Sequence, residues 1–303
     1  MRWTLALVLA LCVAPPAGAQ PEPLVVGVYS PWTYFPDSLS RSRYAMELAG
    51  ALSRSTGLDI DGRGFTAREV FEAQVKAGQI AFAIIDAQHQ LEHGFTPLAQ
   101  TIAHGRPTRS MVLAVRDPSG VDLSAMRGRT LANVLHGPWD ARFVVNFLLR
   151  NQVEPDFFVG GRTVRDVGSA LSLVKLGQVD AAFTYKGTHP GIYESPPVPL
   201  PAFVQTNNSL PVDVVAKVRR AVLGVAVRND VFGGFSAFRH EIYRGLEAAL
   251  STAPRLAQPP PTSRRPRKQR IQRTPYRVSA QGRSGARLME ALGDGLPPPS
   301  GRY

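Results

Sequence analysis

The sequence lacks any long hydrophobic run. Its most apolar stretch, residues 5–13, has nine residues, whereas a helix that crosses a bilayer needs about 20. Arg2 precedes this stretch, and small residues follow it at positions 17–19 (Ala-Gly-Ala). A basic start, a short apolar run and small residues at a cleavage site are the three parts of a secretory signal peptide. We therefore predict that residues 1–19 are removed on export and that the mature protein is periplasmic.

Cysteine is almost absent as well. The chain has one, Cys12, and it lies within the predicted signal peptide. The mature chain would therefore have no disulfide, no thiolate metal site and no cysteine-based catalysis. The alternative is a lipoprotein that is acylated on Cys12. Leu11 argues against this alternative, because a small residue is expected directly before an acylated cysteine.

Acidic residues are scarce in the last 53 positions. Residues 251–303 hold 11 Lys and Arg against 2 Asp and Glu, so they supply +9 of the formal net charge of +12. They also contain nine of the 26 prolines. Such a composition buries too little apolar surface to offset the entropy of ordering, and it predicts a disordered, basic Pro/Arg-rich tail.

Stacking aromatics are nearly missing from this tail, where Tyr276 is the one aromatic beside the basic run. The tail is therefore unlike an arm that binds nucleic acid, in which aromatics alternate with basic residues. In an exported protein, an anionic membrane or a cell-wall polymer is the partner that it suits better. A shifted reading frame in the source gene is a third explanation of its composition.

Motifs of common enzyme classes are missing. The sequence has no G-x-S-x-G pattern and no Walker-type loop. Its six histidines are scattered, and His89, Glu92 and His93 do not have the H-E-x-x-H order of zinc proteases. We therefore expect no catalytic residues, no metal site and no cofactor, in a protein that is not an enzyme.

What is present is the composition of a soluble protein with a core. Hydrophobic residues make up 44% of the chain, and the mean hydropathy is -0.08. These values exclude a wholly disordered chain and a polytopic membrane protein. Residues 20–250 carry 23 Lys and Arg against 21 Asp and Glu, so the predicted folded part is nearly neutral.

A helix–turn–strand unit occurs twice, about a hundred residues apart. In the first copy, a capping-box pattern at residues 66–69 opens a helix, and an apolar strand follows at residues 80–85. The second copy has the same parts at residues 163–166 and 181–185, and both helices end on Lys-x-Gly-Gln and a β-branched residue. Alternating strands and helices predict an α/β fold in which mostly parallel sheets have helices on both faces. The alternative is that the two units are similar only because every α/β protein contains such units.

Two extended segments are placed to join two lobes. Residues 110–116 lead into the second copy of the unit, and residues 200–206 lead back out of it. We therefore divide the chain into a discontinuous lobe 1 (residues 20–112 and 204–250) and a lobe 2 (residues 113–203). The two joining strands predict a hinge, with a cleft between the lobes.

Five short segments between residues 24 and 250 follow one another in a characteristic order. They are V-V-G-V-Y (25–29), A-G-Q-I-A-F-A-I-I-D (77–86), R-S-M-V-L-A-V-R (109–116), M-R-G-R-T-L-A-N (126–133) and L-G-Q-V-D-A-A-F (176–183). This order resembles that of the phosphate- and phosphonate-binding components of ABC transporters, which have the type II periplasmic-binding-protein fold. The resemblance implies a monomer that captures a small ligand between its lobes and delivers it to a membrane permease.

Residues 136–140, His-Gly-Pro-Trp-Asp, depart from the pattern of that family. Members that bind a phosphonate usually have a Ser/Thr-rich turn here, at the start of the lobe 2 helix, and its hydroxyls and amides hold the oxyanion. The present turn offers a histidine and a helix N-terminus, and it adds the carboxylate of Asp140. The ligand therefore stays open between a phosphonate or phosphate-like anion and a related small compound.

The candidate site lies beyond the carboxyl ends of the strands, where ligands bind in open α/β sheets. Trp32 or Tyr34 could form an aromatic wall, and Asp86 could bind a ligand ammonium or cap the next helix. Gly137 allows close approach of the backbone, and Lys186 could pair with an anionic ligand; each could instead be an ordinary loop residue. The candidate ligand-binding residues are Ser30, Trp32, Tyr34, Asp86, Gln88, His136, Gly137, Trp139, Tyr185, Lys186 and Thr206.

Two other functions stay open for the same fold. One is a sensor, whose ligand-bound form signals to a membrane receptor instead of a permease. The other is an exported enzyme that uses the cleft through His136 and Asp140. Steady turnover of a candidate compound would support the enzyme and contradict a purely binding role.

Overall fold

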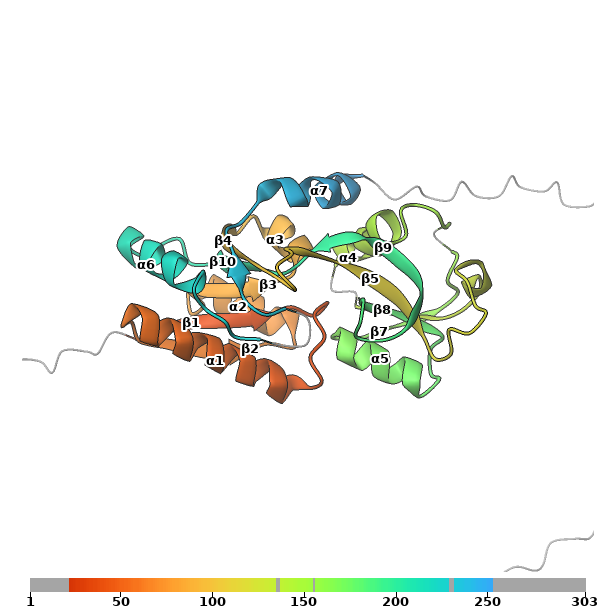
Figure 1. Ribbon diagram of the computed structural model, residues 1–303, viewed down its shortest axis with the longest axis horizontal. Helices are drawn as coiled ribbons and strands as arrows, with labels where there is room; N and C mark the ends of the chain where they lie inside the picture. The colour runs from red at the N-terminus through yellow and green to blue at the C-terminus, as the bar shows by residue number, and fades with distance from the viewer. Residues whose placement is uncertain (1–21, 135–136, 155, 229–231, 253–303) are drawn as a thin grey trace, which may run out of the picture. The chain divides into compact units, whose positions relative to one another are not determined.

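The computed structural model describes residues 22–134, 137–154, 156–228 and 232–252. All of these residues belong to one compact unit of the chain, which is drawn in colour in Figure 1. The predicted signal peptide, His136 and all but two positions of the predicted tail lie outside the described residues. Within the described ranges, no helix is long and apolar enough to cross a membrane.

The first of two open sheets has six strands in the order β11-β4-β10-β3-β1-β2. The strand β1 runs parallel to β2 and β3, whereas β10 is antiparallel to β3 and β4, and β11 is antiparallel to β4. The strands are β1 (Leu24–Tyr29), β2 (Ile60–Gly64), β3 (Phe82–Ile85), β4 (Thr96–Thr101), β10 (Ala202–Gln205) and β11 (Phe235–Ser236).

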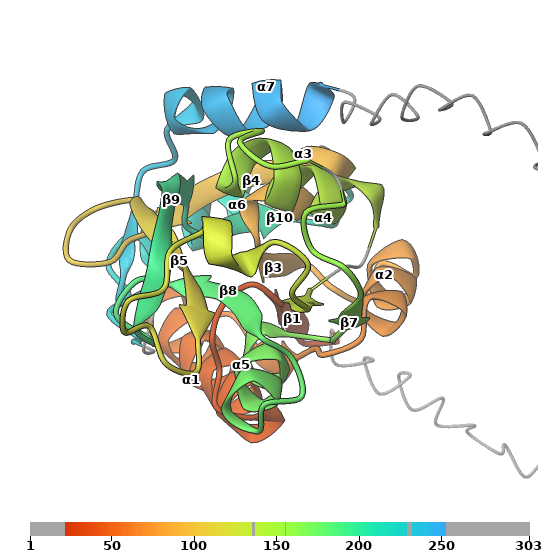
Figure 2. The ribbon, with the colours of Figure 1, turned by 90° about the vertical axis from the view of Figure 1, so that its right-hand side faces the viewer.

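Alternate residues of β1 face two different cores. Val26 and Val28 pack in the core that includes the buried side of α1, whereas Val25 packs with Phe71 of α2. Because successive strand residues point to opposite faces, α1 and α2 cover opposite faces of this sheet, as Figure 2 shows. From here on, lobe 1 means this sheet together with its helices α1 (Ser38–Thr56), α2 (Arg68–Lys76), α3 (Ala87–His93) and α6 (Val212–Val222), and no longer the predicted residue range.

The second sheet has five strands in the order β7-β6-β8-β5-β9. The strand β6 is parallel to β7 and β8, and β5 is antiparallel to β8 and β9. The strands are β5 (Thr108–Val115), β6 (Leu131–Asn133), β7 (Gly161–Thr163), β8 (Ala181–Tyr185) and β9 (Gly191–Pro199). We call this sheet lobe 2, together with its helices α4 (Pro138–Arg142), the π-helical segment η2 (Phe143–Leu148), α5 (Val167–Lys175) and the short 3₁₀ helix η1 (Ser124–Met126).

The two α/β sheets agree with the predicted architecture, but each sheet is mixed instead of mostly parallel. The antiparallel pairs involve the strands at which the chain passes between the lobes: β4 and β10 in lobe 1, and β5 and β9 in lobe 2. These strands are not joined to their neighbours by crossover helices, which is the connection that imposes parallel pairing.

The repeated helix–turn–strand unit is present in both lobes, as α2–β3 and α5–β8. Both helices end on a glycine with positive φ, 72° at Gly78 and 67° at Gly177. In each copy the glycine N–H bonds to the carbonyl three residues earlier, and the next N–H bonds to the carbonyl five residues earlier. The helix starts differ from the prediction, because the N-caps are Ala67 and Asp166. The predicted capping boxes at 66–69 and 163–166 are therefore wrong.

Two neighbouring crossings join the lobes. At one of them the N–H and hydroxyl of Thr101 donate to the carbonyl of Pro201, at 3.1 and 2.6 Å. The N–H of Leu200 donates to the carbonyl of Pro107 at 2.9 Å. The buried Tyr243 hydroxyl donates to the Gln100 side chain at 2.9 Å, so the C-terminal part of the chain packs on the same crossing.

A further connection comes from the C-terminal helix α7 (Arg244–Ser251), which follows the 3₁₀ helix η3 (His240–Tyr243). Arg142 and Asn146 of lobe 2 donate to the carbonyls of Leu250 and Ala249, each at 2.9 Å. The helix α7 therefore contacts lobe 2, although the sequence led us to include it in lobe 1. The lobe boundaries stay a prediction.

Candidate functional site

Asp86, the residue that follows β3, holds the loop after β1 through hydrogen bonds. The Ser30 hydroxyl donates to one oxygen of the Asp86 carboxylate and lies 2.7 Å from the Thr33 hydroxyl. The Trp32 N–H donates to the other carboxylate oxygen at 2.8 Å. All four side chains are buried. The Asp86 carboxylate makes no capping bond to α3, so it fixes the loop and does not cap the helix.

The buried position of Asp86 changes its titration. Burial raises the pKa of Asp86 to about 7, the Ser30 hydroxyl and the Trp32 N–H lower it, and the nearby charge of Asp140 raises it. The carboxylic acid and the carboxylate are therefore both populated near neutral pH.

The side chain of Trp32 reaches from lobe 1 to lobe 2. Its indole Nε1 donates to Asp140 Oδ1 at 3.1 Å. Its ring meets Phe143 edge-on, with centroids 5.0 Å apart and an interplanar angle of 82°. Trp32 and Asp140 are 2% and 1% exposed. The two lobes therefore meet at the carboxyl end of β1 and at the start of the helix formed by α4 and η2.

Arg41 makes a second contact between the lobes. Its guanidinium pairs with Asp166, the N-cap of α5, at 3.1 Å, and it donates to the carbonyl of Phe65 at 3.1 Å. It also lies over the ring of Phe35, 5.1 Å from the centroid. Nearby, the N–H of Val167 donates to the carbonyl of Pro31 at 2.9 Å. The start of α5 is therefore bonded to lobe 1 through both backbone and side chains.

Arg68, the first residue of α2, lies against the turn that precedes α4. It pairs with Glu72 at 2.6 Å and with Glu92 at 2.9 Å. A Cβ atom on Gly137 would lie only 2.8 Å from Arg68 Nη1. This close approach places a guanidinium at the turn where the resemblance leads us to expect ligand-binding hydroxyls.

Comparisons with known proteins decide the family. A family model described as ABC transporter, phosphonate, periplasmic substrate-binding protein matches residues 34–239. The chain belongs to this family. No curated protein matches it.

Several solved structures resemble the chain at low identity. A binding component of an ABC phosphonate transporter from Pseudomonas aeruginosa is 16% identical, with a TM-score of 0.57 over 73% of this chain and 83% of that one. A Prochlorococcus marinus protein in complex with methylphosphonate is 11% identical, with a TM-score of 0.60 over 76% and 97%. A Xanthomonas citri protein bound to ATP is 16% identical, with a TM-score of 0.55 over 75% and 96%. These likenesses confirm the predicted type II periplasmic-binding-protein fold.

The structure brings several of the predicted binding residues together. Ser30, Trp32 and Asp86 share one hydrogen-bonded cluster. Tyr185 is buried near Asp86. Burial raises the pKa of the Tyr185 hydroxyl, and the charge of Asp86 raises it further. The side chain of Gln88 is 1% exposed, and its Nε2 has no hydrogen-bond partner among the described residues.

Other predicted residues lie apart from this cluster or make other bonds. Tyr34 lines a hollow beside α1, and Thr206 donates to the carbonyl of Ile80 at 2.7 Å, within lobe 1. Gly137 contacts Arg68, and Trp139 is half-buried beside Asp140. His136 lies outside the described residues. The assignment of all these residues to ligand binding stays a prediction.

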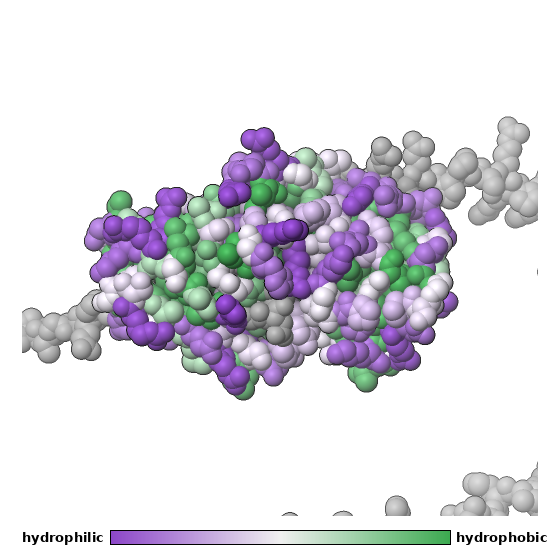
Figure 3. Space-filling model, viewed as in Figure 1, coloured by the Kyte–Doolittle hydropathy of each residue, from purple (hydrophilic) through white to green (hydrophobic). Residues whose placement is uncertain are grey.

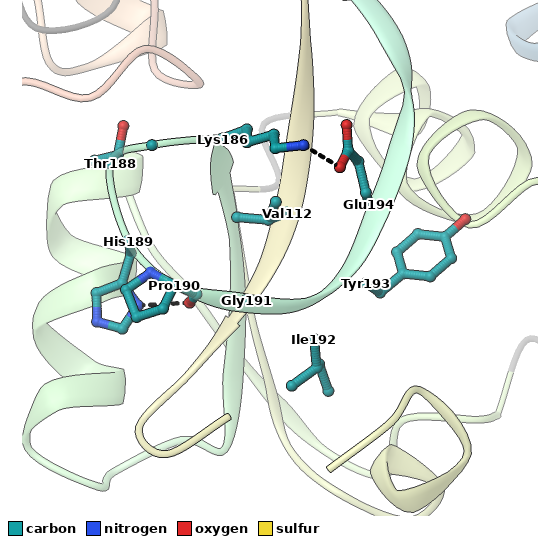
Figure 4. A pocket seen from close by; sticks show the side chains of 10 residues that line it. Val112, Lys186, Thr188, His189, Pro190, Gly191, Ile192, Tyr193 and Glu194 are labelled. Atoms are coloured by element: carbon teal, nitrogen blue, oxygen red, sulfur yellow. Dashed lines mark hydrogen bonds and ion pairs between the residues drawn. The ribbon is translucent and has the colours of Figure 1, made fainter. Parts of the chain in front are cut away.

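Lys186 lines a hollow of about 550 Å³ in lobe 2, between the segment that follows β8 and the start of β9. Figure 4 shows its side chain extended toward Glu194, above Val112. The two charged groups pair at 2.6 Å, and the hydrogen bond from Lys186 lowers the pKa of Glu194. An anionic ligand would therefore compete with Glu194 for this lysine.

Sequence reasoning missed Arg41, Arg68 and Asp166. Each belongs to a helix start, and none follows directly on a strand, so the rule that selected the candidate residues passed over them. Apart from Glu72, which follows Arg68 by four residues on the same helix, their partners are 24 to 125 residues away, and no local pattern signals these distant pairs. Within the part of the chain that the structure describes, no group of three or more His, Cys, Asp or Glu side chains could hold a metal ion.

Proposed function

We propose that this protein captures a small ligand between lobes 1 and 2 and delivers it to the permease of an ABC transporter. The observation that carries the proposal is the hydrogen bond from Trp32 to Asp140, which joins the strand-end loop of lobe 1 to the start of α4 in lobe 2. Ligands of open sheets bind at such strand ends. A ligand that touches both loops would bind the associated lobes more tightly than separated lobes, and it would therefore favour closure.

The ligand class that we propose is a phosphonate or a related small anion. Membership of the phosphonate-binding family supports it, and one structural neighbour is in complex with methylphosphonate. Arg68 presents a guanidinium beside Gly137 at the turn before α4, where an anionic ligand would compete with Glu72 and Glu92 for it. The buried carboxylate of Asp140, and that of Asp86 when it is ionised, would repel a bare oxyanion. A phosphonate that also carries an ammonium group fits this set of charges better.

A ligand screen tests this proposal through two signals. The panel holds phosphate, phosphite, methylphosphonate, aminoethylphosphonate, and amines and anions without phosphorus. A ligand at about 100 times its Kd should stabilise the protein by roughly 2.7 kcal/mol, which a thermal shift detects. Trp32 and Trp139 are the two tryptophans after the predicted signal peptide, so indole fluorescence should report ligand binding at the contact between the lobes.

The variant Arg68→Gln should weaken binding of the phosphonate that stabilises the protein. Arg63→Gln is the matched control, because Arg63 lies on β2 and pairs there with Asp61. A stable protein whose Tm moves with no phosphorus oxyanion would contradict the ligand class. Its response to another compound of the panel would leave the binding role in place.

Export and the membrane partner belong to the same proposal. The family is one of periplasmic binding components, which supports the expected location of this chain. A sensor that signals to a membrane receptor stays the alternative to transport. Genes for an ATPase and a permease beside this one would support transport, and a gene for a kinase would support sensing.

A further inference from the structure

A groove runs along α1 on lobe 1. Its first part, of about 220 Å³, lies between the loop of Tyr34 and Phe35 and the first half of α1. Its second part, of about 480 Å³, lies between the second half of α1 and residues 226–228. Glu47 and Arg228 line both parts, so the two hollows form one continuous surface, which we call the α1 groove.

The α1 groove is lined by more positive than negative side chains. Arg43, Arg54 and Arg228 are exposed, and none forms an ion pair or a side-chain hydrogen bond with any described residue. Glu47 is the one acidic residue among those that line it, and Asp37 lies close enough to Arg43 to feel its charge. Met46 adds an apolar surface and is 52% exposed. The face drawn in Figure 3 has hydrophilic side chains interspersed with short apolar patches, a mixture that suits a weak and reversible contact.

The charge of the α1 groove restricts what can occupy it. The chain's own tail carries 11 basic against 2 acidic residues, so it would be repelled. A second copy that presented the same face would also bring like charges together. An acidic occupant is left, and a recessed groove beside a helix accommodates an extended peptide better than it does the flat surface of a membrane.

One end of the α1 groove is part of the contact between the lobes. Phe35, which lines it, lies under Arg41, and Arg41 pairs with Asp166 of lobe 2. The carbonyl of Phe35 also lies against α5, where a Cβ atom on Gly168 would be 2.7 Å from it. A segment in the α1 groove would therefore touch a loop that lobe 2 holds in place. Such a segment would bind the two lobe arrangements with different affinities.

We propose that the α1 groove docks an acidic extended segment of the membrane partner, and that it docks this segment more tightly when lobe 2 is in contact with lobe 1. The proposal rests on the proposed function, which supplies a membrane partner. It adds the surface, the charge of the partner segment and the dependence on lobe contact.

Charge-reversal variants of the full chain test the docking surface. The probe is a fluorescein-labelled peptide of alternating Glu and Ser, and its binding is followed by anisotropy. The variant R43E/R54E/R228E should bind it about tenfold more weakly than the unmodified chain, because three exposed ion pairs are lost. The control R106E/R239E/R244E reverses three exposed arginines outside the groove and has the same net charge and the same tail. It should bind the peptide within threefold of the unmodified chain.

Three results would overturn the docking surface. An equal loss in both triple variants would mean that the peptide responds to net charge alone. If the unmodified chain and both variants all fail to bind the peptide, the groove is not a peptide site. In the third, the groove variant would lose binding to phosphatidylglycerol vesicles but would still bind the peptide. The surface would then be assigned to a membrane.

The variant Asp166→Asn tests the dependence on lobe contact, because it removes the charge that pairs with Arg41 and keeps a side chain that can cap α5. It should weaken peptide binding several-fold, and unchanged binding would overturn this part of the proposal. The groove variant R43E/R54E/R228E should still show the thermal shift with whichever phosphonate stabilises the unmodified chain in the ligand screen. Failure of docking and failure of the proposed transport function are therefore separate results.

Discussion

Asp86 illustrates how one buried residue links the site to pH. Its carboxylate holds the loop after β1 through Ser30 and Trp32, and its pKa is raised to about 7 by burial. In the unfolded chain the group has its ordinary value near 3.8. The folded protein therefore binds this proton more tightly than the unfolded chain does.

This raised pKa predicts a stability that falls as pH rises. The contribution of Asp86 is fully present below about pH 4, is lost progressively up to about pH 7, and stays constant above that. In Asp86→Asn the group cannot titrate. The free energy of unfolding of the unmodified protein, minus that of Asp86→Asn, should therefore fall by about 1 kcal/mol per pH unit across this interval.

Urea unfolding at several pH values measures this difference. Subtracting the variant removes the opposite effect of carboxylates with lowered pKa, such as Asp180 and Glu194. If this difference in the free energy of unfolding is constant from pH 4 to pH 8, the pKa of Asp86 is not raised in the folded protein.

At the scale of elements, the contact between α5 and lobe 1 depends on a glycine. Gly168 is helical, and an alanine in a helix interior is favoured over glycine by about 1 kcal/mol. A Cβ atom here would lie 2.7 Å from the carbonyl oxygen of Phe35, however, and this oxygen belongs to the backbone of lobe 1. Gly168→Ala should therefore separate α5 from lobe 1 while each lobe stays folded.

Tryptophan fluorescence measures this separation, because the buried Trp32 directly follows Pro31, whose carbonyl accepts the N–H of Val167 in α5. The emission of Gly168→Ala should shift to the red, with little change in helix content by circular dichroism. Gly50→Ala on α1 is the matched control, since the nearest atom to its Cβ would be the flexible end of Arg54 at 3.4 Å. An unchanged emission spectrum in Gly168→Ala would contradict the contact.

The elements that sequence patterns predicted are the central ones. β1, β3 and β8 are short apolar runs, and each lies inside its sheet. The four edge strands β2, β7, β9 and β11 were missed, and so was the interior strand β4. β2 reads I-D-G-R-G and β9 contains three prolines, because edge strands tolerate residues that the interior of a sheet excludes. Their composition therefore resembles that of loops.

The site could be predicted only in part for a related reason. The strand-end rule located Ser30, Trp32 and Asp86, because it follows from topology alone. It could not give the partners Asp140 and Asp166, since these depend on how one lobe lies against the other. The position of lobe 2 against lobe 1 can be read from the folded structure, but not from the local sequence patterns of either lobe.

At the scale of the whole molecule, α7 ties the C-terminal part of the chain to both lobes. Its N-cap is Tyr243, whose hydroxyl donates to Gln100 beside the crossings. It ends on lobe 2, where the buried Asn146 amide donates to the carbonyls of Ala249 and Thr252, each at 2.9 Å. Movement of lobe 2 relative to lobe 1 must therefore break the end of α7 or carry it along.

The variant Asn146→Ala distinguishes these two possibilities. It removes both hydrogen bonds, and the loss of a buried bonding group costs about 1–3 kcal/mol. If α7 restrains lobe 2, the variant should speed hydrogen exchange in residues 244–252 and bind the phosphonate with changed affinity, while exchange in β1 and β3 stays slow. Arg150→Ala is the control, because Arg150 is exposed two residues after η2. Faster exchange with unchanged affinity would mean that α7 follows lobe 2 without restraining it.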